Sequence, residues 1–118
     1  MSKLTFADLR AVNLVRCARW HEGGVAGWSL SDWAVAMAGE AGETCNVVKK
    51  LNRIRDGLTG NNIDEAALRA SLGDEIADTL IYLDLLAAAA GIDLAKAVVN
   101  KFNAVSMRVG FPERLPDE

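Results

Sequence analysis

Residues 33–54 read WAVAMAGEAGETCNVVKKLNRI, and this stretch decides the fold class. Its apolar side chains recur every three or four residues, which is the spacing of one face of an α-helix. When Glu40 is placed at the centre of that face, the residues within about 60° of it are apolar: Trp33, Ala36, Met37, Val47, Leu51 and Ile54. The segment therefore predicts a long amphipathic helix, and the alanine- and leucine-rich composition of the chain favours an all-α fold.

Two carboxylates, those of Glu40 and Glu43, lie on this otherwise apolar face. A second segment repeats the arrangement around Glu75, with Asp78 about 60° away on the same helix. The apolar residues that share its face are Leu68, Leu72, Tyr82 and Leu86. Asp84 projects to the opposite side of this helix, so no special role is expected for it.

Carboxylates on core-facing stripes need a counter-charge, because an unpaired buried carboxylate is costly. The i,i+3 spacing places both acids of each pair on one side of their helix, so two facing helices bring all four to one point. Oxygen ligands of this kind suit Mg²⁺, with Mn²⁺ as the alternative. The competing interpretation is that they are ordinary surface acids.

Capping and glycine signals divide the chain into four helices joined by short loops. Thr5 and Asp8 have the spacing of a capping box, and Ser29 or Ser31 can cap the second helix. The predicted helices cover about residues 5–20, 29–55, 64–91 and 93–108, with glycine-rich loops over 21–27 and 57–62. Gly39 and Gly42 inside the second helix predict a close approach of another helix beside the acids, with mere tolerance of glycine as the alternative. Four connected helices predict a four-helix bundle.

The length of 118 residues predicts a single domain over residues 1–118. The formal net charge of −3 disfavours a protein that binds long nucleic acid. Cys17 and Cys45 have no metal-binding or disulfide spacing and are expected to be reduced thiols. No signal peptide is recognisable, and the apolar run 80–90 is too short to span a membrane, so a cytoplasmic protein without membrane contact is expected.

The acid pairs also carry a family resemblance. Gly39-Glu-Ala-Gly-Glu43, followed by Gly73-Asp-Glu-Ile-Ala-Asp78, resembles the ExxE…ExxD signature of the MazG-like all-α NTP pyrophosphatases, a superfamily that includes dCTP pyrophosphatases and dimeric dUTPases. Residues 78–83 and 100–103 are similar to it too, and the resemblance covers roughly residues 20–112.

This resemblance implies a MazG-type four-helix fold assembled as an oligomer. It implies that Glu40, Glu43, Glu75 and Asp78 bind Mg²⁺ and take part in catalysis. The implied reaction cleaves the α–β linkage of a nucleoside triphosphate to give a monophosphate and pyrophosphate. One of the four acids is expected to act as general base.

Phosphate-binding candidates lie on the second and fourth helices. Lys50 falls at the edge of the Glu40 face, although it and its basic neighbours also complement the negative end of their helix. By resemblance, Lys101 and Arg108 are the better candidates. Many relatives place an asparagine four residues after the lysine, where this chain has Val105; here Asn103 stands two residues after it.

Aromatic residues are the candidates for holding the base, because stacking suits any base. Tyr82 matches a base-pocket position of dCTP pyrophosphatase-like relatives, and His21, Trp28 and Trp33 precede the first acid pair together with Trp20. Trp33 is equally well explained as core, and His21 as a solvated loop residue.

Other protein classes explain the sequence less well. A di-iron bundle would use ExxH pairs, and the chain has one histidine. A nucleotide-binding regulatory homologue without turnover and a purely structural helical dimer stay open. The third helix is apolar almost all round, which predicts a homodimer or a dimer-of-dimers tetramer. The residues that make it so are Ile76, Leu80, Ile81, Leu83, Leu85 and Leu86.

Overall fold

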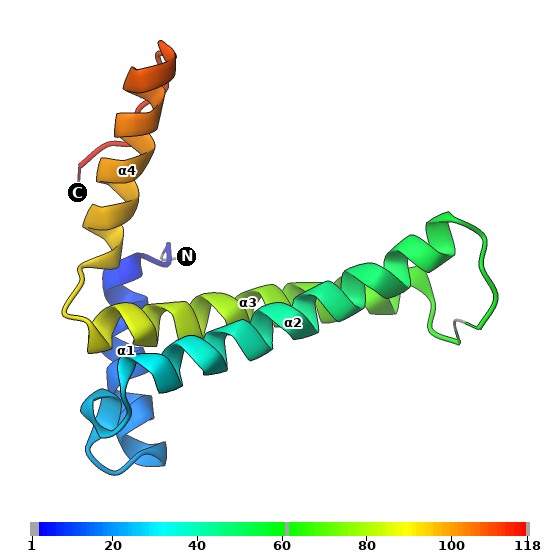
Figure 1. Ribbon diagram of the computed structural model, residues 1–118, viewed down its shortest axis with the longest axis horizontal. Coiled ribbons are helices and arrows are strands. Elements are labelled where there is room, and N and C mark those ends of the chain that lie inside the picture. Colours follow the sequence, from blue (N-terminus) through cyan, green and yellow to red (C-terminus); the bar gives the residue numbers. More distant parts are fainter. Residues whose placement is uncertain (1–2, 61, 118) are drawn as a thin grey trace.

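A computed structural model describes residues 3–60 and 62–117. These residues contain four α-helices and a short 3₁₀ turn, and no strand (Figure 1). The elements are α1 (Phe6–Trp20), η1 (Gly24–Gly27), α2 (Leu30–Arg55), α3 (Glu65–Ala89) and α4 (Leu94–Val109). The four predicted helices are confirmed close to their predicted bounds. Asn61, in the loop predicted over 57–62, lies outside the described residues.

Side-chain caps explain where the helices begin. Thr5 and Asp8 form the predicted capping box at α1, and Ser29 forms a second one with Asp32 at α2. Each of these side chains accepts a backbone N–H that would otherwise lack a partner in the first turn. Ser29 is therefore the cap of α2, rather than the alternative Ser31.

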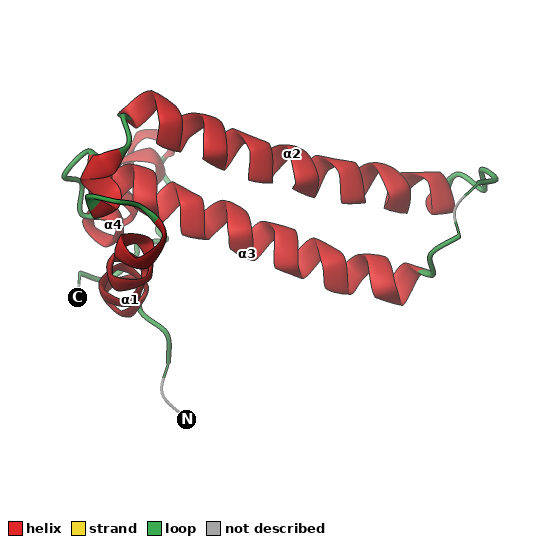
Figure 2. Ribbon diagram, turned by 90° about the horizontal axis from the view of Figure 1, so that it is seen from below, coloured by secondary structure: helices red, strands yellow, loops and turns green. Residues whose placement is uncertain are grey.

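The helices α2 and α3 run side by side as a long antiparallel pair, and α1 crosses one end of this pair (Figures 1 and 2). The fully buried side chains, those of Cys17, Trp33 and Asp84, lie at that end, where α1, η1, α2 and α3 meet. Cys17, Trp33 and Leu85 form the centre of this core. Val25, Tyr82, Leu86 and Ala89 pack against it.

The fourth helix points away from the α2–α3 pair (Figure 1). Gly91, with a φ of 71°, follows the C-terminal end of α3, a backbone conformation that suits glycine. In the described residues α4 approaches α1 and α3 but makes no close approach to α2. One chain alone therefore does not close the predicted four-helix bundle. Its radius of gyration, 17.6 Å, exceeds the value expected of a compact chain of this length, about 13.5 Å.

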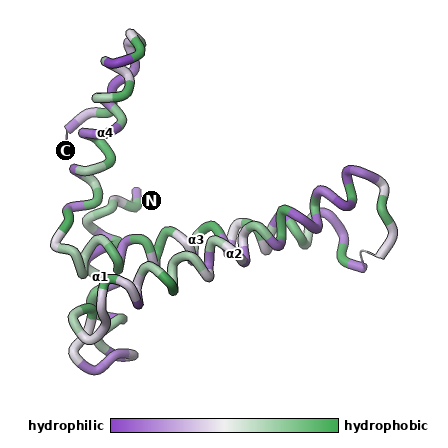
Figure 3. Tube along the Cα trace, in the orientation of Figure 1, coloured by the Kyte–Doolittle hydropathy of each residue, from purple (hydrophilic) through white to green (hydrophobic). Residues whose placement is uncertain are grey.

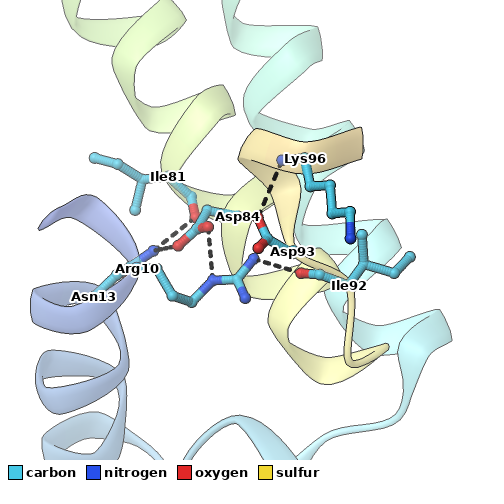
Figure 4. Close-up of polar contacts among 7 residues, drawn as sticks. All are labelled: Arg10, Asn13, Ile81, Asp84, Ile92, Asp93 and Lys96. Carbon is cyan, nitrogen blue, oxygen red and sulfur yellow. Dashed lines mark hydrogen bonds and ion pairs between the residues drawn. The ribbon is translucent and has the colours of Figure 1, made fainter. Parts of the chain in front are cut away.

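A polar network around Asp84 joins α1 to α3 and to the loop that precedes α4 (Figure 4). Arg10 Nε donates to Asp84 Oδ1 at 2.9 Å, and Asn13 Nδ2 donates to Asp84 Oδ2 at 3.0 Å. Arg10 also donates to the carbonyl oxygen of Ile92. Asp84 is fully buried, so the expectation that it needs no special role was wrong. The side of α3 opposite Glu75 is covered by α1, and Asp84 is the acid that holds it there.

Much apolar surface stays exposed on α1, α3 and α4. Figure 3 shows how hydrophobic and hydrophilic residues alternate along these helices. The chain exposes 8265 Å², against about 6,200 Å² for an average monomeric protein of its mass. Gly39 and Gly42 face open space, because a Cβ added at either meets nothing within 4 Å. The close helix approach predicted there is therefore absent within the chain. Among the described helices, none combines the length and the apolar character needed to cross a membrane.

Candidate metal centre

Three of the four predicted acids meet between α2 and α3. Glu40, Glu75 and Asp78 each offer a carboxylate oxygen, and these atoms all lie within 4.8 Å of one another. Glu40 and Glu75 are half-buried between the two helices, and Asp78 is exposed. The antiparallel packing of α2 on α3 thus brings together acids that are 35 residues or more apart in the sequence.

Glu43 is exposed and lies outside this group of three. Its charge nevertheless acts on the group. The pKa of Glu75 is raised above its ordinary value of 4.5, first by partial desolvation and then by the charges of Glu43, Asp78, Glu40 and Asp74, in that order. Asp74 is a contributor that the sequence reasoning did not single out. The negative potential around Glu75 favours a cation there.

The group fits a hard divalent cation. It consists of carboxylates alone, without thiolate or imidazole, and such oxygen donors suit Mg²⁺ or Mn²⁺. Three carboxylates converging without a compensating cation repel one another, which a divalent ion reverses. Glu40, Glu75 and Asp78 are the residues that would hold it, with Glu43 at the margin.

A pocket of about 250 Å³ opens beside these acids. Glu40 and Asp78 form its acidic wall, and α1 supplies Arg16 and Trp20. The remaining lining residues are Asn13, Cys17, Ile81, Tyr82 and Leu85. A larger cavity, about 510 Å³, lies beside Arg10 and Asp84 and contains none of the clustered acids in its lining.

The predicted aromatic residues do gather, but only some line this pocket. His21, Trp28 and Trp33 form a ring cluster with centroid separations of 4.4 to 5.1 Å. Trp33 is fully buried, and its indole N–H donates to the carbonyl oxygen of Val25 at 2.9 Å. It belongs to the core and supports Tyr82, whose ring centroid lies 6.4 Å from its own.

The predicted cations lie away from the acids within one chain. Lys50 follows Glu40 by ten residues, about 15 Å along α2. Lys101 and Arg108 lie on α4, which points away from the α2–α3 pair. Arg16 is a cation in the pocket that the sequence reasoning missed. Its spacing from Asn13, Cys17 and Trp20, typical of one helix face, was the available signal.

Asn103, predicted to contact the substrate, bonds to the C-terminal segment. Its Nδ2 donates to the carbonyl oxygen of Leu115 at 3.0 Å, and the Leu115 N–H donates to its Oδ1 at 2.7 Å. Both ends of the amide are therefore occupied by the backbone of the C-terminal segment. Asn103 fastens that segment to α4.

Comparison with known proteins assigns no family to this chain. No model of a known protein family matches the chain, and no curated protein matches it.

Proposed function

We propose that this protein is a Mg²⁺-dependent nucleoside triphosphate pyrophosphatase. The single observation that carries the proposal is the convergence of Glu40, Glu75 and Asp78 from two helices, with their oxygens within 4.8 Å. The ExxE and ExxD motifs that supply these acids are the ones that resemble the MazG-like enzymes. Mn²⁺ is the alternative ion.

The residues around the acids suit a nucleotide. Trp20 and Tyr82 offer flat surfaces for a base, and Arg16 offers a positive charge for phosphate oxygens. The Arg16 guanidinium lies 5.0 Å from the centre of the Trp20 ring, which holds it beside the pocket.

We propose that the acids bind the divalent cation and orient the triphosphate. A triphosphate carries several negative charges and is repelled by Glu40, Glu43, Glu75 and Asp78 unless a divalent cation lies between them. When bound, Mg²⁺ supplies charge neutralisation and a more acidic water. One of the four carboxylates accepts a proton from the attacking water.

We also propose that the chain works as a homo-oligomer, a dimer or a dimer of dimers. The excess exposed surface, about 2,000 Å² relative to an average monomer, is of the size that obligate interfaces bury. Within one chain α4 turns Lys101 and Arg108 away from the acids. If they bind phosphate, a neighbouring protomer is the one whose acids they reach.

A panel of nucleoside triphosphates, assayed with and without Mg²⁺, tests the reaction. We expect Mg²⁺-dependent release of pyrophosphate from at least one of them. Glu75→Gln and Glu40→Gln should each lower activity by more than about 100-fold, since they remove charged ligands. Glu113→Gln, the same change on the exposed C-terminal segment, is the matched control.

The products separate this function from its alternatives. Release of single orthophosphates would contradict a pyrophosphatase. Tight nucleotide binding without turnover would favour the regulatory homologue. If the chain is a structural dimer with silent acids, neither binding nor turnover should occur, and Mg²⁺ should not stabilise the fold.

A further inference from the structure

The two acid-bearing helices share a second pattern beyond the carboxylates. Each acid pair is followed at once by a threonine, in Glu40-Ala-Gly-Glu-Thr44 and in Glu75-Ile-Ala-Asp-Thr79. The hydroxyl oxygens of Thr44 and Thr79 lie 3.3 Å apart across the seam between α2 and α3. Both side chains are half-buried there. A polar contact thus joins the turns that carry the candidate ligands.

Each hydroxyl is also tied to the backbone of an acid on its own helix. Thr79 Oγ1 donates to the carbonyl oxygen of Glu75 at 2.9 Å, and Thr44 Oγ1 lies 3.2 Å from the carbonyl oxygen of Glu40. A hydroxyl has a single hydrogen, so two hydroxyls cannot fully donate in all three contacts. The short bond uses the hydrogen of Thr79, and the hydrogen of Thr44 is shared between Glu40 and Thr79.

This contact connects Glu40 to Glu75 through four atoms of known position: carbonyl oxygen, hydroxyl, hydroxyl and carbonyl oxygen. We propose that Thr44 and Thr79 are positioning residues that fix the register of α2 against α3, and so set the affinity of the acid cluster for its divalent cation. The inference rests on the proposed metal site and deepens it.

The distances involved make register decisive. A slip of one residue moves a helix by about 1.5 Å along its axis, whereas metal–oxygen distances tolerate about 0.2 Å. Apolar contacts have no fixed direction, whereas a hydrogen bond ties two particular atoms together. A threonine bonded to its own i−4 carbonyl slightly weakens its helix, so the pair adds little helical stability.

The isosteric change of threonine to valine tests the pair, since it removes the hydroxyl and keeps the shape. Mn²⁺ is titrated into the full-length chain, and free Mn²⁺ is followed by electron paramagnetic resonance. We expect Thr79→Val to weaken Mn²⁺ binding by about tenfold, the lower range for partners that orient metal ligands. Thr79→Ser, which keeps the hydroxyl, should restore it. Ser71→Ala, at an exposed hydroxyl of α3, is the control.

A double-mutant cycle separates positioning from general stability. If the hydroxyls act as one unit, Thr44→Val combined with Thr79→Val should weaken Mn²⁺ binding no more than Thr79→Val alone. Urea unfolding without metal is measured in parallel. Loss of stability with unchanged Mn²⁺ affinity would overturn the inference, and so would a serine variant as weak as the valine variant. Where Thr79→Val fails to fold, Thr44→Val and Thr44→Ser provide the same comparison.

The wild-type titration separates a failure of the metal site from a failure of the positioning role. A wild-type chain that binds no Mn²⁺ would overturn the proposed metal site and this inference together. A wild-type chain that binds Mn²⁺, with valine variants that bind it equally well, would overturn only the positioning role.

Discussion

Arg10 Nε donates to Asp84 Oδ1 at 2.9 Å, and the two side chains differ sharply in burial: 24% of Arg10 is exposed but only 1% of Asp84. Arg10 can therefore turn toward solvent if it loses its partner, whereas Asp84 cannot. Asn13 and Arg10 together satisfy both oxygens of the carboxylate. The pair fixes α1 against the face of α3 that carries Asp84, and so supports the wall that α1 provides to the pocket beside Glu40 and Asp78.

This asymmetry predicts unequal effects of the two single substitutions. Arg10→Met strands a buried carboxylate and should lower the free energy of unfolding by about 3–5 kcal/mol. Asp84→Leu should cost less, because the freed guanidinium can reach water. The double variant should be more stable than Arg10→Met alone, since no buried charge is left. Urea unfolding measures all three.

The exposed ion pair of Arg55 and Asp56 serves as the control. Exposed pairs contribute little, so Arg55→Met should leave the unfolding midpoint nearly unchanged. The loss of unfolding free energy in the double variant of Arg10 and Asp84 should be smaller than the sum of the two single losses. A loss equal to that sum would contradict the role of the buried ion pair.

The raised pKa of Glu75 predicts how metal-free stability depends on pH. Its folded-state pKa lies above the ordinary value of 4.5, so the folded chain takes up this proton more readily than the unfolded chain. The resulting stabilisation is full below pH 4.5 and is lost as the pH rises through the folded pKa. At neutral pH, Glu75→Gln should therefore raise the melting temperature of the metal-free protein.

Mg²⁺ should reverse the order of stability, so that the wild type becomes more stable than Glu75→Gln. The wild type gains stability at neutral pH because the cation offsets the repulsion, whereas Glu75→Gln gains much less. Thermal unfolding with and without millimolar Mg²⁺, from pH 4.5 to neutrality, measures both effects. A Glu75→Gln protein that is less stable than the wild type without metal would show that the acids do not repel one another.

The helices were predictable because their signals are local. Thr5, Ser29, Asp64 and Asp93 each accept a backbone N–H within their own first turn, and a neighbouring sequence suffices to recognise such a cap. The direction of α4 was not predictable in the same way. It depends on the turn after Gly91 and on the bond from Arg10 to Ile92, which joins residues 82 positions apart.

The site was predictable in part for a related reason. Projection of α2 and α3 placed Glu40 and Glu75 on facing stripes, and the structure brings them together with Asp78. The same projection failed for Asp84, because it assumed one covered face, whereas α1 covers a second face of α3. Arg16 was missed because the acid of α1, Asp8, belongs to its capping box, so no acid marked the inner side of this helix.

Trp20 and Trp33 should separate binding from folding. Trp20 is 64% exposed at the pocket, so Trp20→Ala should change the free energy of unfolding little. It should weaken nucleotide binding by about tenfold, since one stacked base contributes about 1–3 kcal/mol. Trp33→Ala should instead lower the free energy of unfolding by about 3–5 kcal/mol, the usual cost of emptying a buried tryptophan site.

Binding of a non-hydrolysable triphosphate, followed by calorimetry in the presence of Mg²⁺, and urea unfolding provide the two measurements. Trp33→Ala should be tested for binding only where it is folded. Unchanged nucleotide affinity in Trp20→Ala would remove the pocket beside Glu40 and Asp78 as the base site.

The apolar stripe of α4 predicts where a second copy binds. Val98, Phe102 and Val109 recur at helical spacing on one side of α4, and each is more than a third exposed in the single chain. Burying such side chains against another protomer contributes roughly 1.5–3 kcal/mol each. Phe102→Asp should therefore shift the protein toward the 12.6 kDa monomer in sedimentation at micromolar concentration.

Met107→Asp is the matched control, because Met107 is 71% exposed and lies about 140° from Phe102 around the helix. A wild-type chain that sediments as a monomer would show that the stripe has no partner copy. A Met107→Asp variant that dissociates like Phe102→Asp would show that the interface is not confined to the side of α4 that carries Phe102.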